Sequence, residues 1–412
     1  MKSNILIAFF IITGVVLRLI WTADMEWKGD EQWMFEHAQA AAKSGNWNLV
    51  GMESSTGIVN PGLSVWVFTV ISFFTSTPTG MDTGVQLINV FVLLGFVFFV
   101  FKKIKPEQRE IWLWGLALAA VSPLAVLFSR KIWEQDTIVL FSFFTIVGNA
   151  YRTKKLGAFI WGIAGAMAGQ VHMSGFFYAF GIVVFSIYYD YLTKTKTQYW
   201  WWFVGSVIGS IGLIPWINYL LLHPHPSELS WAHIFQFSFY FYFFMDALGL
   251  NIMYSIRQEF WQFIQLPFVG NMPLYLIAVA HLFLAATGLY VVKRIYDYAK
   301  KNAKIIASKK AFNNYIIQVN QAEFYLFSIL LGLGIFMNCN GAITFQHYLI
   351  VGFPFSYLFL SKVLFQKKRW LIATIFAQFF ITVSFMIYVH VHNGIENANY
   401  GKAYHAQIEN KK

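Results

Sequence analysis

Long apolar runs separated by short polar segments fill most of the chain. Runs long enough to form helical spans fall at 4–22, 84–101, 111–129, 137–150, 156–171, 173–189, 199–221, 272–292, 322–337, 348–364 and 370–389. A bilayer core about 30 Å thick is crossed by about 20 apolar helical residues. The pattern therefore predicts an all-α, polytopic membrane protein with about 11 transmembrane helices. We treat residues 1–412 as a single transmembrane domain.

Loop charge predicts how these spans are oriented. With the N-terminus in the cytoplasm, 21 of the 30 Lys and Arg residues fall on the cytoplasmic side, which is a strong positive-inside bias. The apolar run 61–76 has only 16 residues, and a span there would move every later basic loop outside. We therefore predict an interfacial or half-inserted helix at 61–76, and two long outer loops at 24–83 and 222–271.

Composition supports a membrane protein and excludes some partners. The chain is 58% hydrophobic and 12% charged, whereas soluble domains carry about 25% charged residues. Its net charge of +11 is explained by cytoplasmic lysines that face anionic lipid, so we expect a lipid bilayer and no nucleic acid as partner. Cys339 is the one cysteine, which excludes an internal disulfide. The first run lacks a small-residue cleavage site and is expected to be a retained span.

Acidic residues show the opposite bias. In this topology 14 of 19 lie outside, so we expect any acid–base chemistry to be extracytoplasmic. Asp30 and Glu31 follow the first span and open a predicted helix at 31–43. Asp30 could simply cap that helix, but a cap needs only one carboxylate. Arg18 lies within the first span, where an arginine usually has a partner or a function.

A tight outer hairpin at 129–136 carries the second group of candidates. Arg130 and Lys131 break the positive-inside rule and indicate an anion bound outside. Glu134 and Asp136 could be their ion-pair partners or part of a site.

Histidines at the outer ends of spans form the third group. His172 lies in an outer turn, and His347 and Tyr348 lie at similar depth, while loop 222–271 contributes Arg257. His223 and His225 could bind a metal, but no Cys or acidic partner is spaced for a closed site. We therefore expect no metal and no other cofactor.

These features resemble the GT-C integral membrane glycosyltransferases, with protein O-mannosyltransferases and lipid A aminoarabinose transferases as the nearest types. The matching elements are Arg18 near the end of the first span, Asp30-Glu31 opening an outer helix that ends at 44–47, Asn60-Pro61-Gly62-Leu63, the hairpin from Arg130 to Asp136, and His347-Tyr348 followed by Pro354. Gly62 replaces the second proline of a Pro-Pro-Leu element, and His347 replaces an arginine.

The resemblance implies a multi-span helical fold with outer-face juxtamembrane helices and a site on the extracytoplasmic face of a bacterial cytoplasmic (inner) membrane. It implies a polyprenyl-phosphate sugar donor, transfer with inversion, and a lipid, glycan or protein hydroxyl as acceptor. Asp30 would be the catalytic carboxylate with Glu31 beside it. Donor-phosphate or substrate contacts would come from Arg18, Arg130, Lys131, Glu134, Asp136, His172, Arg257, His347 and Tyr348.

Two other functions stay open. An oligosaccharide ligase or polymerase would use a diphosphate-linked glycan, and the two long outer loops suit it equally. A lipid or solute transporter would place charges near mid-membrane, whereas these predicted spans are nearly charge-free at their centres. Product formation separates an enzyme from a transporter.

Overall fold

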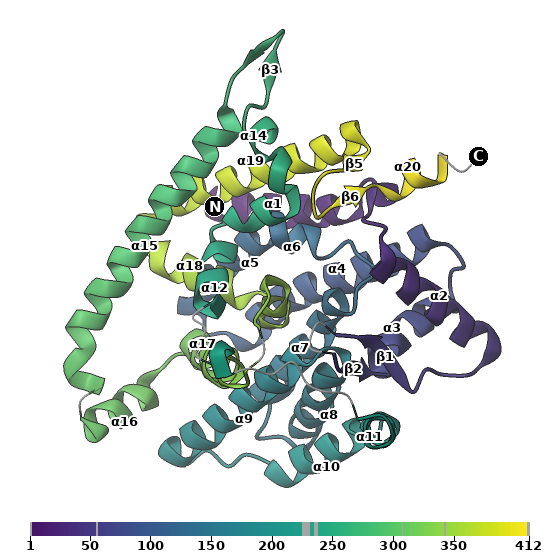
Figure 1. Cartoon of the computed structure of the whole chain (residues 1–412). Helices are drawn as coiled ribbons and strands as arrows, with labels where there is room; N and C mark the ends of the chain where they lie inside the picture. The colour runs from purple at the N-terminus through teal and green to yellow at the C-terminus, as the bar shows by residue number, and fades with distance from the viewer. Residues whose placement is uncertain are drawn as a thin grey trace.

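The computed structural model describes residues 2–54, 57–224, 231–234, 238–306, 308–341 and 343–409 of the chain (Figure 1). Helices make up most of it, and the strands form three separate two-stranded antiparallel hairpins. The predicted all-α class is confirmed.

The elements of the first half lie at these positions. They are α1 (Lys2–Leu19), η1 (Thr22–Asp24), α2 (Gly29–Ser44), β1 (Val50–Glu53), β2 (Val59–Pro61), α3 (Leu63–Ser72), α4 (Pro78–Lys103), α5 (Pro106–Val121), α6 (Pro123–Leu127), α7 (Glu134–Ala150), α8 (Lys155–Val171), α9 (Ser174–Thr193), α10 (Tyr199–Gly209) and α11 (Leu213–Leu222).

The second half contains more short elements. They are η2 (Trp231–His233), α12 (Ser238–Ala247), η3 (Leu250–Ile252), α13 (Met253–Ile256), η4 (Arg257–Glu259), α14 (Phe260–Phe263), β3 (Phe268–Val269), β4 (Met272–Pro273), α15 (Leu276–Ile306), α16 (Lys309–Gln318), α17 (Gln321–Ile329), η5 (Leu330–Phe336), η6 (Met337–Cys339), η7 (Gln346–Gly352), α18 (Phe355–Leu364), η8 (Phe365–Lys367), α19 (Lys368–His392), β5 (Gly394–Ile395), β6 (Gly401–Lys402) and α20 (Tyr404–Glu409).

Every predicted span contains a helix. Five stretches of the described chain are long and apolar enough to cross a membrane, or up to six if the bent pair α10–α11 is one span. Residues 3–19 and α3 form shorter apolar helices. The chain is thus an integral, multi-pass membrane protein, while the number of eleven spans stays a prediction.

The region 24–83, predicted as an outer loop, contains regular secondary structure. Its helix α2 includes the predicted helix 31–43, and the ten-residue α3 lies where a short helix was expected. A β1–β2 hairpin connects them. Helix α4 begins six residues before the predicted span because the Thr77 hydroxyl accepts the backbone N–H of Gly80 and Pro78 occupies the first helical turn.

The region 222–271 also differs from a simple outer loop. Helix α12 within it packs against α18. Ser356 and the Tyr357 hydroxyl donate hydrogen bonds of 3.1 and 3.0 Å to the Asp246 carboxylate at the end of α12. This segment therefore returns into the helical bundle, which its apolar, aromatic sequence permits.

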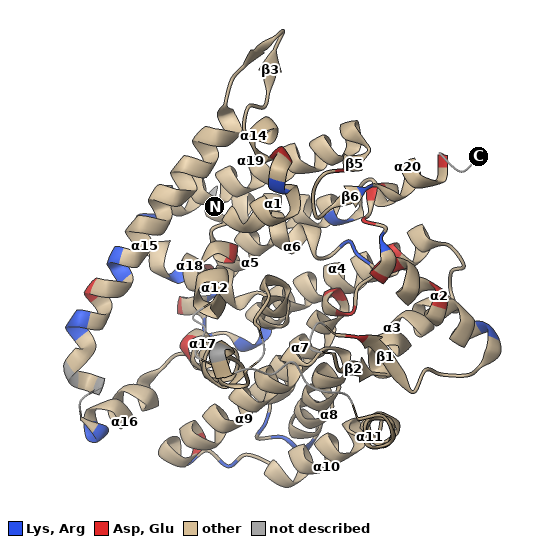
Figure 2. Ribbon diagram, viewed as in Figure 1, with Lys and Arg blue, Asp and Glu red and all other residues tan. Residues whose placement is uncertain are grey.

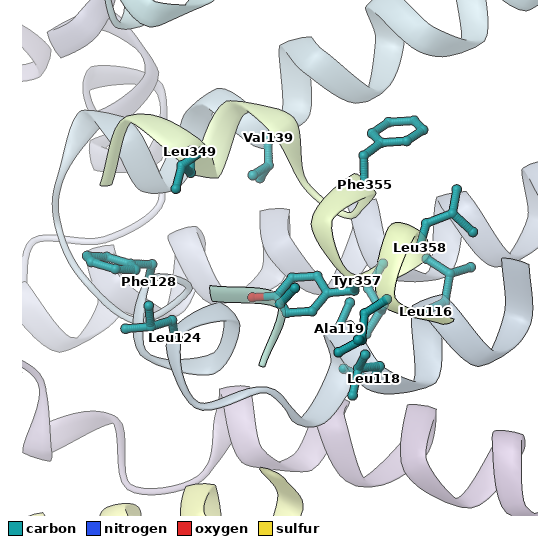
Figure 3. Close-up of a cluster of buried hydrophobic side chains, with 14 of the residues drawn as sticks. Leu116, Leu118, Ala119, Leu124, Phe128, Val139, Leu349, Phe355, Tyr357 and Leu358 are labelled. Carbon is teal, nitrogen blue, oxygen red and sulfur yellow. The ribbon is translucent and has the colours of Figure 1, made fainter. Parts of the chain in front are cut away.

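A hydrophobic core surrounds helix α5, which is buried along its second half. Figure 3 shows part of this core, where side chains from α5, α6, α7, η7 and α18 meet. Helices α5 and α18 approach closely because Gly115 has no side chain: a Cβ atom there would lie 2.9 Å from the Leu358 Cα atom. This core supports the segment between α6 and α7.

Two buried arginines fasten the end of α1 to this core. Arg18 is 1% exposed, and its guanidinium donates to the carbonyls of Gly14, Ala119, Ala120 and Ala125. Arg130 is 3% exposed and donates to the carbonyls of Leu17, Arg18, Ile20 and Trp21. The last carbonyls of a helix lack intrahelical partners and carry partial negative charge. Arg130 therefore caps α1 from a distant part of the chain.

Replacing this cap should destabilise the protein. Arg130→Met leaves several buried carbonyls without a donor, and we expect a loss of at least about 3 kcal/mol of unfolding free energy. The apparent melting temperature in detergent should fall accordingly. Arg369→Met, at an exposed arginine of α19, is the control and should melt like the parent. Equal melting of the two variants would contradict the capping role.

Candidate active site

A cavity of about 330 Å³ collects most of the predicted site residues. Seven of the eleven candidates line it, namely Asp30, Glu31, Lys131, Glu134, His172, His347 and Tyr348. They come from α2, the segment between α6 and α7, the start of α7, the turn after α8, and the segment around η7. Acidic residues gather around α2 and β1, on the right of the view in Figure 2.

The two adjacent carboxylates at the start of α2 have different surroundings. Glu31 is 3% exposed and its Oε2 accepts the backbone N–H of Lys28 at 3.0 Å. Glu31, rather than Asp30, therefore caps the helix. Burial, and then the neighbouring Glu26, raise the pKa of Glu31 above its ordinary value. Asp30 is exposed on the cavity wall, and its carboxylate is free to meet a bound molecule.

A carboxylate bridges the two lysines of the cavity. Glu26 is buried, with Oε1 2.5 Å from the Lys131 Nζ and Oε2 2.7 Å from the Lys28 Nζ. Burial lowers the pKa of Lys131, but Glu26, then Glu31 and Asp136, raise it more, so its pKa lies above the ordinary value. Two ammonium groups thus lie on either side of one carboxylate.

Glu134 joins the α7 end of the cavity to the β1–β2 hairpin. The Asn60 Nδ2 donates to the Glu134 Oε1 at 3.2 Å, while the Glu134 Oε2 is buried and accepts no hydrogen bond from the described residues. Burial raises the pKa of Glu134 to about 7, with smaller contributions from the charges of Asp30 and Glu31. Glu134 therefore changes charge near neutral pH.

Aromatic rings surround the imidazole of His347. Measured between ring centroids, Trp133 lies 4.7 Å from His347 and His172 lies 6.2 Å from it. The Phe345 ring stacks on the His347 ring at 5.7 Å. Burial lowers the pKa of His172 to about 4, and burial followed by the charges of His172 and Lys131 places the pKa of His347 well below its ordinary value. Both imidazoles are neutral at pH 7 in this arrangement.

Four candidates do not line the cavity. Arg18 and Arg130 bind backbone carbonyls of the core, as described above. Asp136 is completely buried in the first turn of α7, and neither of its carboxylate oxygens has a hydrogen-bond partner among the described residues. Arg257 is exposed and lies over the Tyr254 ring, 5.7 Å from its centroid.

Further residues of the cavity were not among the candidates. Glu26 and Lys28 precede α2, and their place just before the Asp30-Glu31 pair is a signal that could have found them. Asn399 had no such signal, because it comes from the far end of the chain. Its carbonyl accepts a hydrogen bond from the Lys28 Nζ, and the Tyr404 N–H donates to the Met25 carbonyl at 3.1 Å. The C-terminal segment thus forms part of the cavity wall.

The described residues contain no group of three or more His, Cys, Asp and Glu side chains that could hold a metal ion. His223 is exposed, and its Nδ1 lies 3.1 Å from the Tyr219 carbonyl oxygen. His225 lies outside the described residues.

Comparison with solved structures identifies the fold. The chain is similar to ArnT from Cupriavidus metallidurans in the apo state, with a TM-score of 0.50, 12% identity, and coverage of 89% of this chain and 60% of ArnT. It is also similar to ArnT bound to undecaprenyl phosphate, with a TM-score of 0.48, 12% identity, and coverage of 87% and 60%. No protein-family model matches the chain, and no curated protein matches it in sequence.

The apo ArnT structure shows that this chain has an ArnT-like polytopic fold, so the predicted resemblance to lipid A aminoarabinose transferases is confirmed at the level of the fold. The chain spans three-fifths of the length of ArnT.

Removing the bridging carboxylate should change the titration of Lys131. In Glu26→Gln, burial of Lys131 remains while the main charge that raises its pKa is lost, so the ammonium should lose its proton at lower pH. Acylation of Lys131 by an amine-reactive ester, followed by peptide mass spectrometry across pH 7–11, should show a midpoint shifted to lower pH. Glu36→Gln, on the exposed side of α2, is the control, and an unshifted midpoint in Glu26→Gln would contradict the bridge.

Proposed function

We propose that the protein is a glycosyltransferase that moves a sugar from a polyprenyl-phosphate donor to an acceptor hydroxyl. The observation that carries the proposal is the cavity itself, in which the exposed Asp30 carboxylate and the bridged pair Lys28 and Lys131 meet. The ArnT-like fold supports it, since ArnT has also been crystallised with undecaprenyl phosphate. The sugar and the acceptor, whether lipid, glycan or protein, are left open.

Asp30 is the proposed general base. An acceptor hydroxyl attacks the anomeric carbon while its proton passes to the Asp30 carboxylate, and the bond between that carbon and the phosphate oxygen breaks. The electron pair leaves on the polyprenyl phosphate, and attack from the opposite face inverts the anomeric centre. A base must lie within hydrogen-bond reach of the hydroxyl, and an exposed carboxylate on the wall meets that need. Glu31 maintains the start of α2.

The two lysines are the proposed binding groups for the donor phosphate. Positioned cations stabilise charge that develops on a leaving group. Glu26 already holds Lys28 and Lys131 around one anionic group, so a phosphate that displaces or joins it would find both ammonium groups oriented. His347 and His172 are neutral, and we assign them to hydrogen bonding and to packing against the sugar or lipid, together with Tyr348.

Charge asymmetry supports the proposed orientation. The positive-inside bias favours a cytoplasmic N-terminus, with this cavity on the outer face of a bacterial inner membrane. A polyprenyl-linked donor suits that location, because it needs no soluble nucleotide sugar on the outer side.

Asp30→Asn should abolish transfer. Loss of a general base costs about 10²–10⁴-fold in rate, and Asp30 is exposed, so the protein should fold normally. The assay uses purified protein with a panel of polyprenyl-monophosphate sugars and measures released polyprenyl phosphate. Glu36→Gln on the same helix should keep full activity. Full activity of Asp30→Asn with a donor that the parent uses would refute the assignment.

The same assay separates the competing functions. A ligase or polymerase would consume diphosphate-linked donors and leave monophosphate donors intact. A transporter would move substrate across liposome membranes without releasing polyprenyl phosphate.

Glu134 should impose a pH dependence on donor binding. As pH rises through about 7, Glu134 becomes a carboxylate and adds negative charge beside an anionic donor. A repulsion of about 1 kcal/mol would raise KM for the donor roughly fivefold. KM measured from pH 6 to 9 should rise in the parent and stay flat in Glu134→Gln. Glu53→Gln removes another carboxylate of the cavity but leaves Glu134, so it should keep the rise; a rise that persists in Glu134→Gln would exclude this role.

A further inference from the structure

A second polar cavity, of about 300 Å³, lies at the other end of α7 from Glu134. Helix α7 has 17 residues, so its two ends are about 25 Å apart. The cavity forms where the connections α4–α5, α7–α8 and α16–α17 meet. The α4–α5 and α7–α8 connections carry basic residues, Lys105, Arg152 and Lys154, that the positive-inside rule assigns to the cytoplasm. The candidate active-site cavity, called the outer cavity below, and this second cavity, called the inner cavity, therefore lie near opposite membrane surfaces.

Three cationic side chains, Lys103, Lys105 and Arg152, line the inner cavity, and no described carboxylate lines it. In this respect it is the opposite of the outer cavity, whose lining includes five Asp or Glu residues and two lysines.

One of these cations, Arg152, is paired with a buried acid, Asp190. Asp190 is 4% exposed and accepts hydrogen bonds from the Arg152 Nε at 3.0 Å, the Thr197 hydroxyl at 2.6 Å and the Tyr199 hydroxyl at 2.9 Å. The Arg152 Nη2 lies 2.5 Å from its other oxygen. Asp190 therefore balances the charge of Arg152 and fixes the guanidinium at the cavity wall.

Lys103 and Lys105 have no such counterion. Neither ammonium lies within 4 Å of a carboxylate in the described part of the chain, and the Lys103 Nζ lies over the Tyr151 ring, 4.3 Å from its centroid. Two positive charges thus face one small polar space without compensation.

The start of helix α17 also faces this cavity. Asn320 caps this helix, its Oδ1 accepting the Glu323 N–H at 3.1 Å, and both Asn320 and Gln321 line the cavity. The first turn of a helix presents free N–H groups and a partial positive charge. Glu323, the acidic residue of that turn, accepts the Asn320 N–H at 2.9 Å and forms an ion pair with Lys362. Its carboxylate offsets part of the charge at the helix start, but it does not line the cavity.

We propose that this inner cavity binds the phosphate headgroup of an anionic phospholipid from the cytoplasmic leaflet. Basic pockets between membrane helices at that face bind anionic headgroups. The remaining lining includes apolar and aromatic side chains such as Val319 and Phe324, which suit the glycerol and upper acyl region of a lipid better than a free ion. The site is independent of the proposed sugar transfer.

The test compares lipid binding to the full-length protein in detergent by native mass spectrometry, with phosphatidylglycerol and phosphatidylcholine as probes. The double variant Lys103→Gln/Lys105→Gln should bind phosphatidylglycerol about 30-fold more weakly, because each lysine near an anionic lipid contributes about fivefold. Binding of phosphatidylcholine should not change. Lys155→Gln/Lys196→Gln removes two exposed cytoplasmic charges outside the cavity and should bind phosphatidylglycerol like the parent.

Several outcomes would overturn the proposal. Equal affinity of the parent and the Lys103/Lys105 variant for phosphatidylglycerol would exclude the site. An equal loss in the Lys155/Lys196 control would indicate nonspecific surface charge. Displacement of the lipid by inorganic phosphate at similar concentrations would identify a soluble phosphate as the ligand. Lys103→Arg/Lys105→Arg keeps both charges and should retain binding, which separates the loss of charge from misfolding.

Discussion

The hydrogen bonds from Arg130 to the last carbonyls of α1 are the constraint on which the candidate active site depends. Arg130 and Lys131 are adjacent, yet the first points into the core and the second lines the cavity. By binding the end of α1, Arg130 fixes where the following segment leaves the core, and that segment carries Glu26 and Asp30. Arg18 holds the same helix against α5 and α6. Arg18 and Arg130 were predicted from the sequence to contact a ligand. They instead set the distance between the two sides of the cavity.

The sequence patterns predicted the fold more accurately than they predicted the directions in which individual side chains point. Apolar runs gave helices throughout, and Asp30 was correctly expected at a helix start. Lys131, His172 and His347, which were candidates because they break the charge bias or recur at one depth, line the cavity. Arg18 and Arg130 break the same rules, but whether an arginine faces a cavity or a helix end depends on packing between segments about a hundred residues apart, which the sequence alone does not specify.

Long-range contacts account for the remaining surprises. Helix α12 lies in a segment that was predicted as an outer loop, because ten mostly aromatic residues are too few for a membrane span to be predicted. Asn399 joined the cavity because the C-terminal segment pairs with the chain before α2, where Glu26 and Ala403 form an isolated β-bridge. Neither contact leaves a local signal, since each depends on where a distant partner lies.

The two cavities differ in how strongly they should hold an anion. In the outer cavity Glu26 already pairs with both Lys28 and Lys131, so a phosphate that displaces it would gain only the difference in free energy between its own contacts with the lysines and those of the carboxylate. Such an exchange suits a phosphate that must be released after each transfer. In the inner cavity no described carboxylate competes for Lys103 and Lys105. A bound phosphate would therefore gain the full free energy of interaction with both lysines, and no carboxylate of the cavity would take its place when it leaves. The arrangement of carboxylates, more than the number of lysines, would therefore distinguish the proposed transfer site from the proposed lipid site.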